Sequence, residues 1–312
     1  MTKVFIDGSA GTTGLRIFDR LSARKDIDLI ILDDSKRKDE KYRKEALNSC
    51  DIAFLCLPDQ AAIDTIPLVT NENTVIIDTS TAHRTNKNWT YGFPEISNFR
   101  EKIRNSKRIA NPGCHASGFI ALVRPLIQAG ILKNDIHLTS FSITGYSGGG
   151  KKMIADYESD DRSPLLEGPR QYALTQQHKH LKEMVSVCDL RTTPVFCPVV
   201  ADFYSGMEVT VPLFKDNLKG SIDDIRSIYK KMYNTSIIHY DEDDDENGFA
   251  SASKYTGYDD MQITLKGNED RILLISRYDN LGKGASGSAI QNMNIIMGVS
   301  EKTGLNVTED KK

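Results

Sequence analysis

Residues 3–14, KVFIDGSAGTTG, join a strand-like apolar run to a turn with three glycines. The turn consists of Gly8, Ser9, Ala10, Gly11, Thr12, Thr13 and Gly14. A helix is predicted over residues 13–23, directly after it. Glycines let the backbone approach a pyrophosphate closely, and the amide groups at a helix start attract its charge. The position between strand and helix therefore favours dinucleotide binding over an ordinary glycine-rich turn.

Short apolar runs alternate with helix-prone segments through the first third of the chain. Apolar runs occupy residues 27–32, 51–57 and 74–78, and helix-prone segments occupy residues 35–48 and 59–67. Parallel strands buried under helices on both faces have this pattern. It predicts an α/β domain of the Rossmann type.

Strand candidates with mixed polarity follow one another in the rest of the chain, without regular helical crossovers. They lie at residues 136–144, 195–199, 207–213, 261–265 and 272–276. Such grouping predicts an α+β domain with a mostly antiparallel sheet. The spacing of apolar residues over 286–299 predicts an amphipathic helix. We expect residues 1–113 and 286–312 to form the cofactor domain, and residues 114–285 to form a catalytic and oligomerisation domain.

Composition excludes several classes of partner. The 312 residues carry a net charge of −3, which argues against nucleic acid or an anionic membrane surface as the main partner. No apolar stretch approaches the roughly 20 residues of a membrane span, and the N-terminus has no signal-peptide core. Five cysteines without a CxxC pair suggest neither a zinc ribbon nor a disulfide scaffold, so a cytoplasmic protein without a metal is expected.

The residues that follow the second apolar run leave the choice of dinucleotide open. Asp33 or Asp34 could accept from the ribose 2′-hydroxyl of NAD, whereas Lys36 and Arg37 could hold the 2′-phosphate of NADP. These cations could also be a solvated helix start. We predict NADP.

Cys114 in the stretch NPGCHASG, residues 111–118, precedes an apolar pattern typical of a helix. A thiol at a helix N-terminus gains a lower pKa from the free amide groups and the dipole. Spacing alone does not distinguish this reactive thiol from a buried, inert one. Cys56 and Cys188 lie inside apolar runs and are interpreted as inert. Pro125 is expected to kink or shorten the helix.

A reactive thiol acting on a carbonyl needs an acid or base. His178 and His180 fall in a helix predicted over residues 172–186, where residues two apart point to different sides. Sequence geometry cannot choose between them, and His83 and His115 are further candidates. A zinc site is not expected, because no third ligand has suitable spacing.

Two other segments carry weaker signals. The glycine-dense stretch at residues 145–151 ends in a lysine and could bind an anion through its backbone, or be a mobile loop. The acidic run at residues 241–246 is expected to be a solvated loop without a functional role.

Together these stretches resemble the N-acetyl-gamma-glutamyl-phosphate reductase family, in its shorter variant, within the aspartate-semialdehyde dehydrogenase superfamily. The matching segments span nearly the whole chain. They are GSAGTTG (8–14), KRKD (36–39), LPD (57–59), DTSTAHR (78–84), YGFPE (91–95), NPGCHASG (111–118), SGGGK (147–151) and DNLGKGASGSAIQNMN (279–294). The resemblance implies the two-domain architecture inferred above, with a terminal helix that returns to the cofactor domain.

The resemblance also implies roles for individual residues. Cys114 matches the nucleophile and His180 the acid/base of the family. Arg84 matches a residue that holds the substrate phosphate, and Asn292 lies in the helix that approaches the nicotinamide. Asn111 and Gly149 are expected at the substrate. The family usually has proline where this chain has Lys182, so the turn that supports His180 is expected to differ.

The implied reaction is NADPH-dependent reduction of an acyl phosphate, N-acetyl-gamma-glutamyl phosphate, through a cysteine thioester in arginine biosynthesis. Three alternatives remain open: the same chemistry on aspartyl or another acyl phosphate, a reductase without a covalent intermediate, and a non-catalytic NADP-binding redox regulator. We expect a small-molecule substrate and a homo-oligomer, either a dimer or a tetramer.

Overall fold

The computed structural model describes residues 1–308, and the chain divides into two compact units. The first unit comprises Met1–Pro112 and Ala285–Leu305, and the second comprises Gly113–Gly284 with the segment that begins at Asn306. The sequence-based division differs by one residue at each internal boundary and in the placement of residues 306–308. The part of that division that covers residues 309–312 lies outside the described residues.

A six-stranded sheet forms the centre of the first unit, with the strand order β2-β1-β3-β4-β6-β5. Its strands are β1 (Thr2–Asp7), β2 (Ile27–Ile30), β3 (Ile52–Leu55), β4 (Val75–Asp78), β5 (Thr90–Tyr91) and β6 (Arg108–Ala110). All neighbouring pairs are parallel. Every residue of β3 and β4 is buried, as expected for parallel strands between two helical layers. The Rossmann-type prediction is confirmed.

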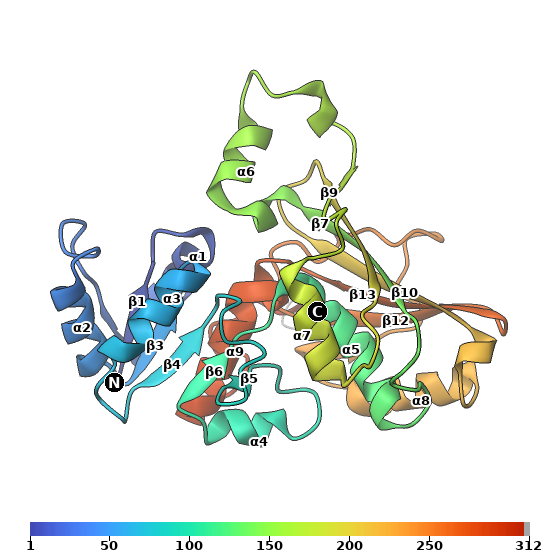
Figure 1. Ribbon diagram of the computed structural model, residues 1–312, viewed down its shortest axis with the longest axis horizontal. Helices are drawn as coiled ribbons and strands as arrows, with labels where there is room; N and C mark the ends of the chain where they lie inside the picture. The colour runs from blue at the N-terminus through green and yellow to red at the C-terminus, as the bar shows by residue number, and fades with distance from the viewer. Residues whose placement is uncertain (309–312) are drawn as a thin grey trace. The chain divides into compact units, whose positions relative to one another are not determined.

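Helices connect these strands (Figure 1). They are α1 (Thr12–Ser22), α2 (Glu40–Ser49), α3 (Asp59–Thr65), a 3-10 turn (Ile66–Leu68) and α4 (Phe99–Arg104). A further helix of this unit, α9 (Gly287–Met297), comes from the end of the chain and connects no strands of the sheet. The chain leaves β1 toward β2 on one side, and later continues with β3 on the other side of β1. This reversal opens a crevice beyond the carboxyl end of β1, the usual ligand site of such sheets.

The terminal helix α9 is not amphipathic, contrary to the prediction. Its residues from Gly287 to Ile295 are all buried, including the polar side chains of Gln291, Asn292 and Asn294. Asn294 donates to the carbonyls of Glu301 and Thr303, and so pays the desolvation cost with hydrogen bonds to the chain that follows. The apolar residues are spaced as predicted, but the polar residues between them, expected to face solvent, are buried and have hydrogen-bond partners in the protein.

A seven-stranded sheet forms the second unit, with the strand order β11-β12-β13-β10-β7-β9-β8. Its strands are β7 (Thr139–Gly145), β8 (Arg170–Gln171), β9 (Val195–Ala201), β10 (Met207–Phe214), β11 (Ile238–Tyr240), β12 (Met261–Gly267) and β13 (Arg271–Tyr278). Only the β7–β9 and β11–β12 pairs are parallel among these described strands. The mostly antiparallel sheet is confirmed.

The helices of the second unit include α5 (Cys114–Gln128), which packs on β10 and β13, and α7 (Lys179–Cys188), which packs on α5 (Figure 1). Its other helices are α6 (Gly150–Glu158) and α8 (Ile222–Met232). Pro125 does not end α5, which continues to Gln128.

Helix α7 begins later than predicted. Ala173 and Gln176 have positive φ angles of 54° and 56°, which a right-handed helix cannot include. The chain therefore turns through residues 173–177, and His178 becomes the residue that caps α7.

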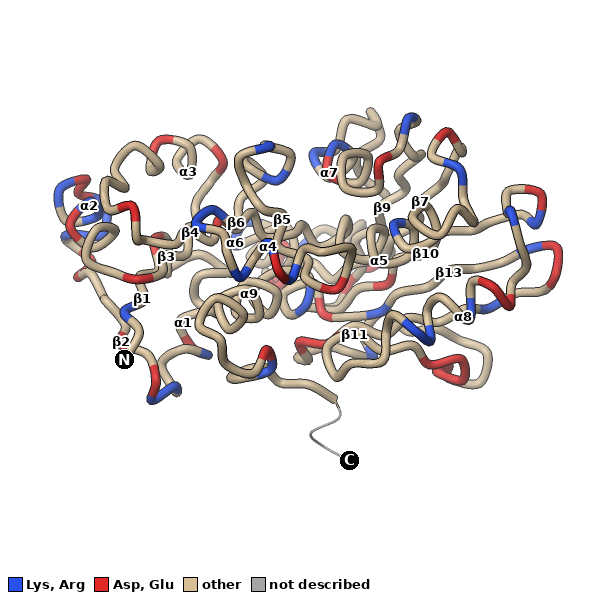
Figure 2. Tube along the Cα trace, turned by 90° about the horizontal axis from the view of Figure 1, so that it is seen from below, with Lys and Arg blue, Asp and Glu red and all other residues tan. Residues whose placement is uncertain are grey.

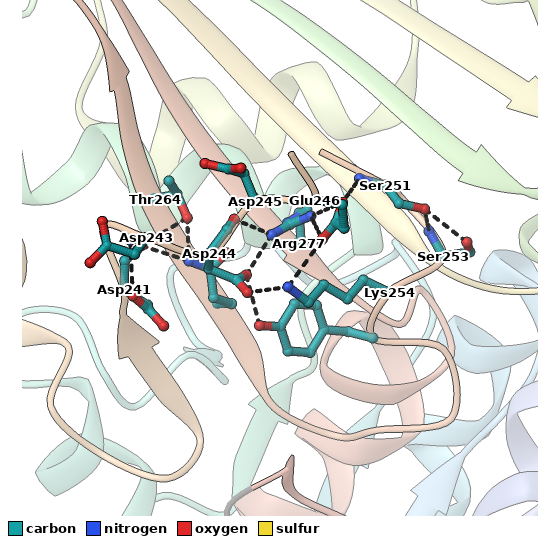
Figure 3. A network of polar contacts seen from close by, with 12 residues as sticks. Asp241, Asp243, Asp244, Asp245, Glu246, Ser251, Ser253, Lys254, Thr264 and Arg277 are labelled. Carbon is teal, nitrogen blue, oxygen red and sulfur yellow. Dashed lines mark hydrogen bonds and ion pairs between the residues drawn. The ribbon is translucent and has the colours of Figure 1, made fainter. Parts of the chain in front are cut away.

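The acidic run at residues 241–246 is not simply solvated. Arg277, which is 1% exposed, pairs with Asp244 and Glu246, and Lys254 pairs with the same two carboxylates (Figure 3). The run is therefore fastened to β13, because a buried guanidinium needs compensating charge. No local sequence pattern indicates this partner, which lies 31 residues beyond Glu246.

Charge is otherwise mixed along both units, and stretches of acidic and basic residues interrupt each other (Figure 2). Within residues 1–308, no helix has the length and apolar character that a membrane crossing requires.

Candidate active site

The glycine-rich turn of the first unit depends on two glycines that nothing else could replace. Gly8 has φ of +89°, and a Cβ there would lie 2.3 Å from the carbonyl oxygen of Cys56. A Cβ at Gly14 would lie 2.4 Å from the carbonyl oxygen of Gly8. Gly11 caps α1 and has no side chain to cover the first turn. The turn is thus compact, and its amide groups remain the natural partners of an anion.

A cavity of about 310 Å³ lies beside this turn. Gly8 and Ser9 line it on one side, and Arg37, Lys38 and Arg43 bring positive charge to it. Sequence reasoning named Arg37 but missed Lys38 and Arg43. Lys36, which was also predicted at the cofactor, is absent from this lining and approaches Asp33 at 3.7 Å.

Neither candidate for a ribose-binding carboxylate lines the cavity. The side chains of Asp33 and Asp34 are 78% and 93% exposed. The carboxylate that does line the cavity is Asp7 at the end of β1, and it is engaged by Arg43 at 2.7 Å. The polar groups of the cavity are therefore dominated by cations.

A second polar cluster of the first unit contains three of the predicted site residues. The Arg84 guanidinium donates to the carbonyl oxygens of Asn111 and Thr79, at 2.8 and 3.1 Å. The Asn292 amide donates to the side-chain oxygen of Asn111 at 3.2 Å and to the carbonyl of Gly92 at 3.0 Å. The structure thus brings Arg84, Asn111 and Asn292 together, although Asn292 is fully buried.

His83, an alternative acid/base candidate, is held in the same unit. Its Nδ1 lies 2.6 Å from Asp78, and its ring stacks on Trp89 with centroids 4.0 Å apart. These contacts explain His83 as a structural residue.

Cys114 is the first residue of α5 in the second unit, directly after the N-cap Gly113. Gly284 lies against it, because a Cβ at position 284 would come within 3.0 Å of the Cys114 Cβ. The other cysteines differ: burial raises the pKa of Cys56 to about 12 and raises that of Cys188 further. These two thiols are inert, as interpreted from the sequence.

Helix α7 presents His180 and Glu183 on one face, since residues three apart are neighbours on a helix. Both side chains are buried, and the Glu183 carboxylate accepts from the N–H of Gly113 at 2.7 Å. Glu183 therefore ties the helix that carries His180 to the N-cap of the helix that carries Cys114. Lys182, the departure from the family pattern, is exposed, and α7 continues through it.

The capping contact distinguishes the two histidines of α7. The Nδ1 of His178 accepts from the N–H of His180 at 3.2 Å, so His178 caps the helix. The two rings meet edge-on with centroids 4.7 Å apart. This arrangement gives His178 a structural role and favours His180 as the acid/base.

His115 stands at the centre of a buried polar chain. Its Nδ1 lies 2.7 Å from the Ser142 hydroxyl and its Nε2 lies 2.6 Å from the Tyr172 hydroxyl. Burial, and then the charge of His178, lower the pKa of His115 to about 3, so the ring is neutral. The His180 ring is 5.6 Å away between centroids. His115 is thus a scaffold for the histidine cluster rather than a proton donor.

Tyr172 belongs to this cluster, although sequence reasoning did not find it. Burial, and then the neighbouring Cys114, raise the pKa of the Tyr172 hydroxyl. The hydroxyl thus stays protonated near the cysteine. Tyr172 has no local pattern that would have identified it, because its partners lie in α5 and α7.

Gly149 lies in a different setting from the one expected. The stretch predicted as a flexible loop forms a 3-10 turn, Tyr146–Gly149, that leads directly into α6. Gly149 caps α6, is exposed, and would carry its Cβ into Met153. The glycines thus permit a close turn into a helix.

Known proteins match this chain over nearly its whole length. Residues 3–106 match the model described as semialdehyde dehydrogenase, NAD binding domain, and residues 114–280 match semialdehyde dehydrogenase, dimerisation domain. An N-acetyl-gamma-glutamyl-phosphate reductase 2 of Nostoc sp. is 42% identical, covering 97% of this chain and 99% of its own. The reductase of Sinorhizobium medicae is 41% identical, covering 95% and 98%.

Solved structures agree on the fold. Aspartate semialdehyde dehydrogenase II from Vibrio cholerae superposes with a TM-score of 0.74 at 17% identity, covering 96% of this chain and 99% of its own. The enzyme from Candida albicans, solved with NADP, gives 0.68 at 14% identity, covering 95% and 98%. With relatives above 40% identity along almost the entire chain, the protein belongs to the N-acetyl-gamma-glutamyl-phosphate reductase family.

Proposed function

We propose that this protein reduces N-acetyl-gamma-glutamyl phosphate to N-acetyl-glutamate 5-semialdehyde with NADPH, releasing phosphate, in arginine biosynthesis. The observation that carries the proposal is the docking of α7 on α5. Glu183 binds the N–H of Gly113, next to Cys114, from the helix face that also holds His180. The names of relatives at 41–42% identity support the substrate.

The chain supplies a nucleophile and a proton donor to this reaction. The Cys114 thiolate attacks the carbonyl carbon of the acyl phosphate, the carbon–oxygen bond to phosphate breaks, and a thioester forms. Amide groups at the start of α5 stabilise the oxyanion. Bound NADPH would supply the hydride that reduces the thioester to a thiohemiacetal. The thiohemiacetal, formed as its oxyanion, collapses to the aldehyde as its carbon–sulfur bond breaks, and His180 protonates the departing Cys114 sulfur.

The first unit supplies the binding groups in this proposal. The turn from Gly8 to Gly14 receives the pyrophosphate, and Arg84 receives the phosphate of the substrate. Asn111, which Asn292 holds, lies beside Arg84 and provides a further substrate contact. Gly149 is also proposed as a substrate-binding residue. Asn292 supports the nicotinamide site through Asn111.

We infer that NADP is preferred over NAD. The cavity beside the glycine turn is lined by Arg37, Lys38 and Arg43, which suit a 2′-phosphate. Asp33 and Asp34 do not line it, and the exposed Asp34 carboxylate lies 3.1 Å from Arg37. Replacing Arg37 with Gln is expected to raise the KM for NADPH about tenfold, because a charge-assisted contact is lost. The KM for NADH should remain within a factor of two. An equal rise for both cofactors would contradict the assignment.

We also propose a homo-oligomer, a dimer or tetramer, formed through the second unit, whose matched family model is described as a dimerisation domain. A cytoplasmic location is in keeping with cysteines that form no disulfide among residues 1–308. Size-exclusion chromatography with light scattering measures the assembly, and a monomer at micromolar concentration would overturn the first proposal.

The reverse reaction tests the function directly. The purified protein should reduce NADP when N-acetyl-glutamate semialdehyde and phosphate are both present, and either omission should stop it. Aspartate semialdehyde, assayed in parallel, should be turned over at least 100-fold less efficiently. Equal or better turnover of aspartate semialdehyde would replace the proposed substrate. Binding of NADP without any turnover would instead indicate a regulator.

Cys114→Ser tests the covalent route. Serine is a far weaker nucleophile at neutral pH, so the rate should fall by a factor of about 10³ or more. Near wild-type turnover by this variant would contradict a thioester intermediate.

A further inference from the structure

The first turn of α5 contains a hydroxyl that comes from another element. In a regular α-helix, the carbonyl of Cys114 accepts from the N–H of Gly118, four residues later. The Tyr278 hydroxyl of β13 lies between these two groups. It accepts from the N–H of Gly118 at 3.0 Å and donates to the carbonyl of Cys114 at 2.6 Å. The turn that begins with the nucleophile is therefore bridged by a side chain.

Gly118 makes room for this hydroxyl. A Cβ at position 118 would lie 2.6 Å from the Tyr278 oxygen and 2.5 Å from the Ser276 hydroxyl. Any other residue would displace β13 side chains from the helix. The glycine in the NPGCHASG stretch is thus explained by the tyrosine rather than by helix formation, which glycine disfavours.

The tyrosine is held firmly from its own strand. β13 lies between β10 and β12, with Tyr278 opposite Met207 and Met261. The preceding residue, Arg277, points to the opposite face and pairs with Asp244 and Glu246 (Figure 3). The end of β13 is therefore fixed on both faces of the sheet, so the hydroxyl has little freedom to move away from α5.

The hydroxyl also remains a donor. Tyr278 is fully buried, and burial, followed by the nearby Cys114, raises the pKa of its hydroxyl well above the ordinary value. A neutral phenol can donate to one backbone group and accept from another, as this bridge requires.

We propose that Tyr278 is a positioning residue for the nucleophile, whose hydroxyl sets the first turn of α5 and thereby the direction of the Cys114 sulfur. This inference rests on the proposed covalent function of Cys114. A side-chain hydroxyl that contacts the backbone hydrogen-bond ladder of a helix restrains the local helix geometry. Without the hydroxyl, the Cys114 carbonyl and the Gly118 N–H lose their contact with β13, the first turn of α5 is no longer held from the sheet, and the thiol is presented differently to the carbonyl and to the amide groups.

The chain offers a matched control. Tyr233 is also a buried tyrosine of this unit, and its hydroxyl donates to an α5 carbonyl, that of Ala121, at 2.6 Å. Tyr233→Phe thus removes the same kind of bond from the same helix, two turns away from Cys114. A merely structural role for Tyr278 predicts the same result for both variants.

The kinetic test compares Tyr278→Phe with Tyr233→Phe in the phosphate-dependent reverse reaction. Tyr278→Phe should lower kcat about tenfold or more with KM changed less than twofold, since misplacement of a reacting group acts on the chemical step. Tyr233→Phe should keep kcat within twofold, although both variants lose similar stability in urea. Equal kcat values in the two variants would overturn the proposal.

A second measurement needs no substrate. The rate of iodoacetamide alkylation of Cys114, followed by mass spectrometry of its peptide across pH, reports the thiol pKa. We expect the midpoint to rise in Tyr278→Phe and to stay at the wild-type value in Tyr233→Phe, because thiolate stabilisation depends on the geometry of the helix start. An unchanged midpoint together with unchanged kcat would leave Tyr278 as a core residue.

Cys114→Ser, assayed alongside, separates the two proposals. If Cys114→Ser is inactive while Tyr278→Phe matches Tyr233→Phe, only the positioning role fails. If Cys114→Ser retains turnover, the proposed covalent function fails first.

Discussion

Two helices of the candidate site, α1 and α5, begin with a glycine N-cap, and they differ in whether side chains bind the start of the helix. Gly11 precedes α1 and Gly113 precedes α5. The start of α1 has no side-chain hydrogen bond at its N-cap, and Gly8 and Gly14 make room for the backbone carbonyls of Cys56 and Gly8. The start of α5 is built from distant elements, because α7 supplies Glu183 and β13 supplies Tyr278.

The difference separates two uses of a helix N-terminus. An end left without side chains can receive a large anion, whose charge the amide groups and dipole favour. An end held by side chains keeps its own first residue in a fixed geometry, which suits a nucleophile. The same local sequence feature, glycine before a helix, therefore does not reveal which use applies.

The largest effect is expected from adding a side chain to the glycine-rich turn before α1. Gly8→Ala places a Cβ 2.3 Å from the Cys56 carbonyl at a positive φ, so the free energy of unfolding should fall by about 2 kcal/mol or more. NADPH binding should weaken more than tenfold. Denaturation in urea without cofactor, and fluorescence titration with NADPH, measure the two effects.

Gly11→Ala is the control for this turn. Gly11 has φ of −77°, and a Cβ there would lie 3.4 Å from the Gly8 carbonyl oxygen, so its stability should change by less than about 1 kcal/mol. If both variants lose equal stability, the turn is not held by the close contact at Gly8.

Glu183→Ala should remove the hydrogen bond that holds the start of α5 to α7. It leaves the buried N–H of Gly113 without its acceptor, at a cost of about 1–3 kcal/mol, and releases α7 from α5. We expect kcat to fall at least tenfold, because His180 is no longer fixed relative to Cys114. Glu183→Gln keeps an oxygen acceptor and should recover most of the activity. Equal losses in the Ala and Gln variants would show that the charge, rather than the hydrogen bond, is required.

The two helix starts also mark what could be predicted from the sequence. The Rossmann-type sheet, the glycine turn and the helix at Cys114 depend on local patterns, and the structure has all three. The two hydrogen bonds that hold the start of α5 do not depend on local patterns. Glu183 lies 70 residues from Gly113, and Tyr278 lies 164 residues from Cys114. A single sequence carries no signal for such pairings, because loop length barely restricts them.

Helix α7, which carries His180, shows where a local pattern led to a wrong prediction. Its predicted start at residue 172 followed apolar spacing, but backbone with positive φ at Ala173 and Gln176 delays α7 to Lys179. That delay makes His178 a cap and leaves Tyr172 available to His115. The turn was not predicted, since neither alanine nor glutamine is a usual residue at positive φ.

The neutral His115, second residue of α5, should make stability depend on pH. Its folded pKa of about 3 lies below the ordinary value near 6.5. Below pH 6.5 the unfolded chain therefore binds a proton that the folded protein does not, so the free energy of unfolding decreases as pH falls from 6.5 toward 3. Between pH 7 and pH 5 this group alone should remove about 2 kcal/mol of stability. Urea unfolding of the wild type and of His115→Gln, each at pH 7 and at pH 5, separates the contribution of His115 from those of the other titratable groups. A difference between the two proteins that stays constant with pH would mean that folding does not lower the pKa of His115.

The smallest effect is expected where the chain departs from its family. Lys182 is exposed near the start of α7, whereas His180 and Glu183 are buried and contact α5 and its N-cap. Lys182→Pro, which restores the usual family residue, should therefore change kcat by less than about twofold, because residue 182 is the fourth of α7 and proline there removes only the first backbone hydrogen bond of the helix. Steady-state kinetics beside Lys182→Ala measures it. A tenfold change in the proline variant alone would mean that the backbone at residue 182 sets the position of His180, and that Glu183 is not sufficient to hold it.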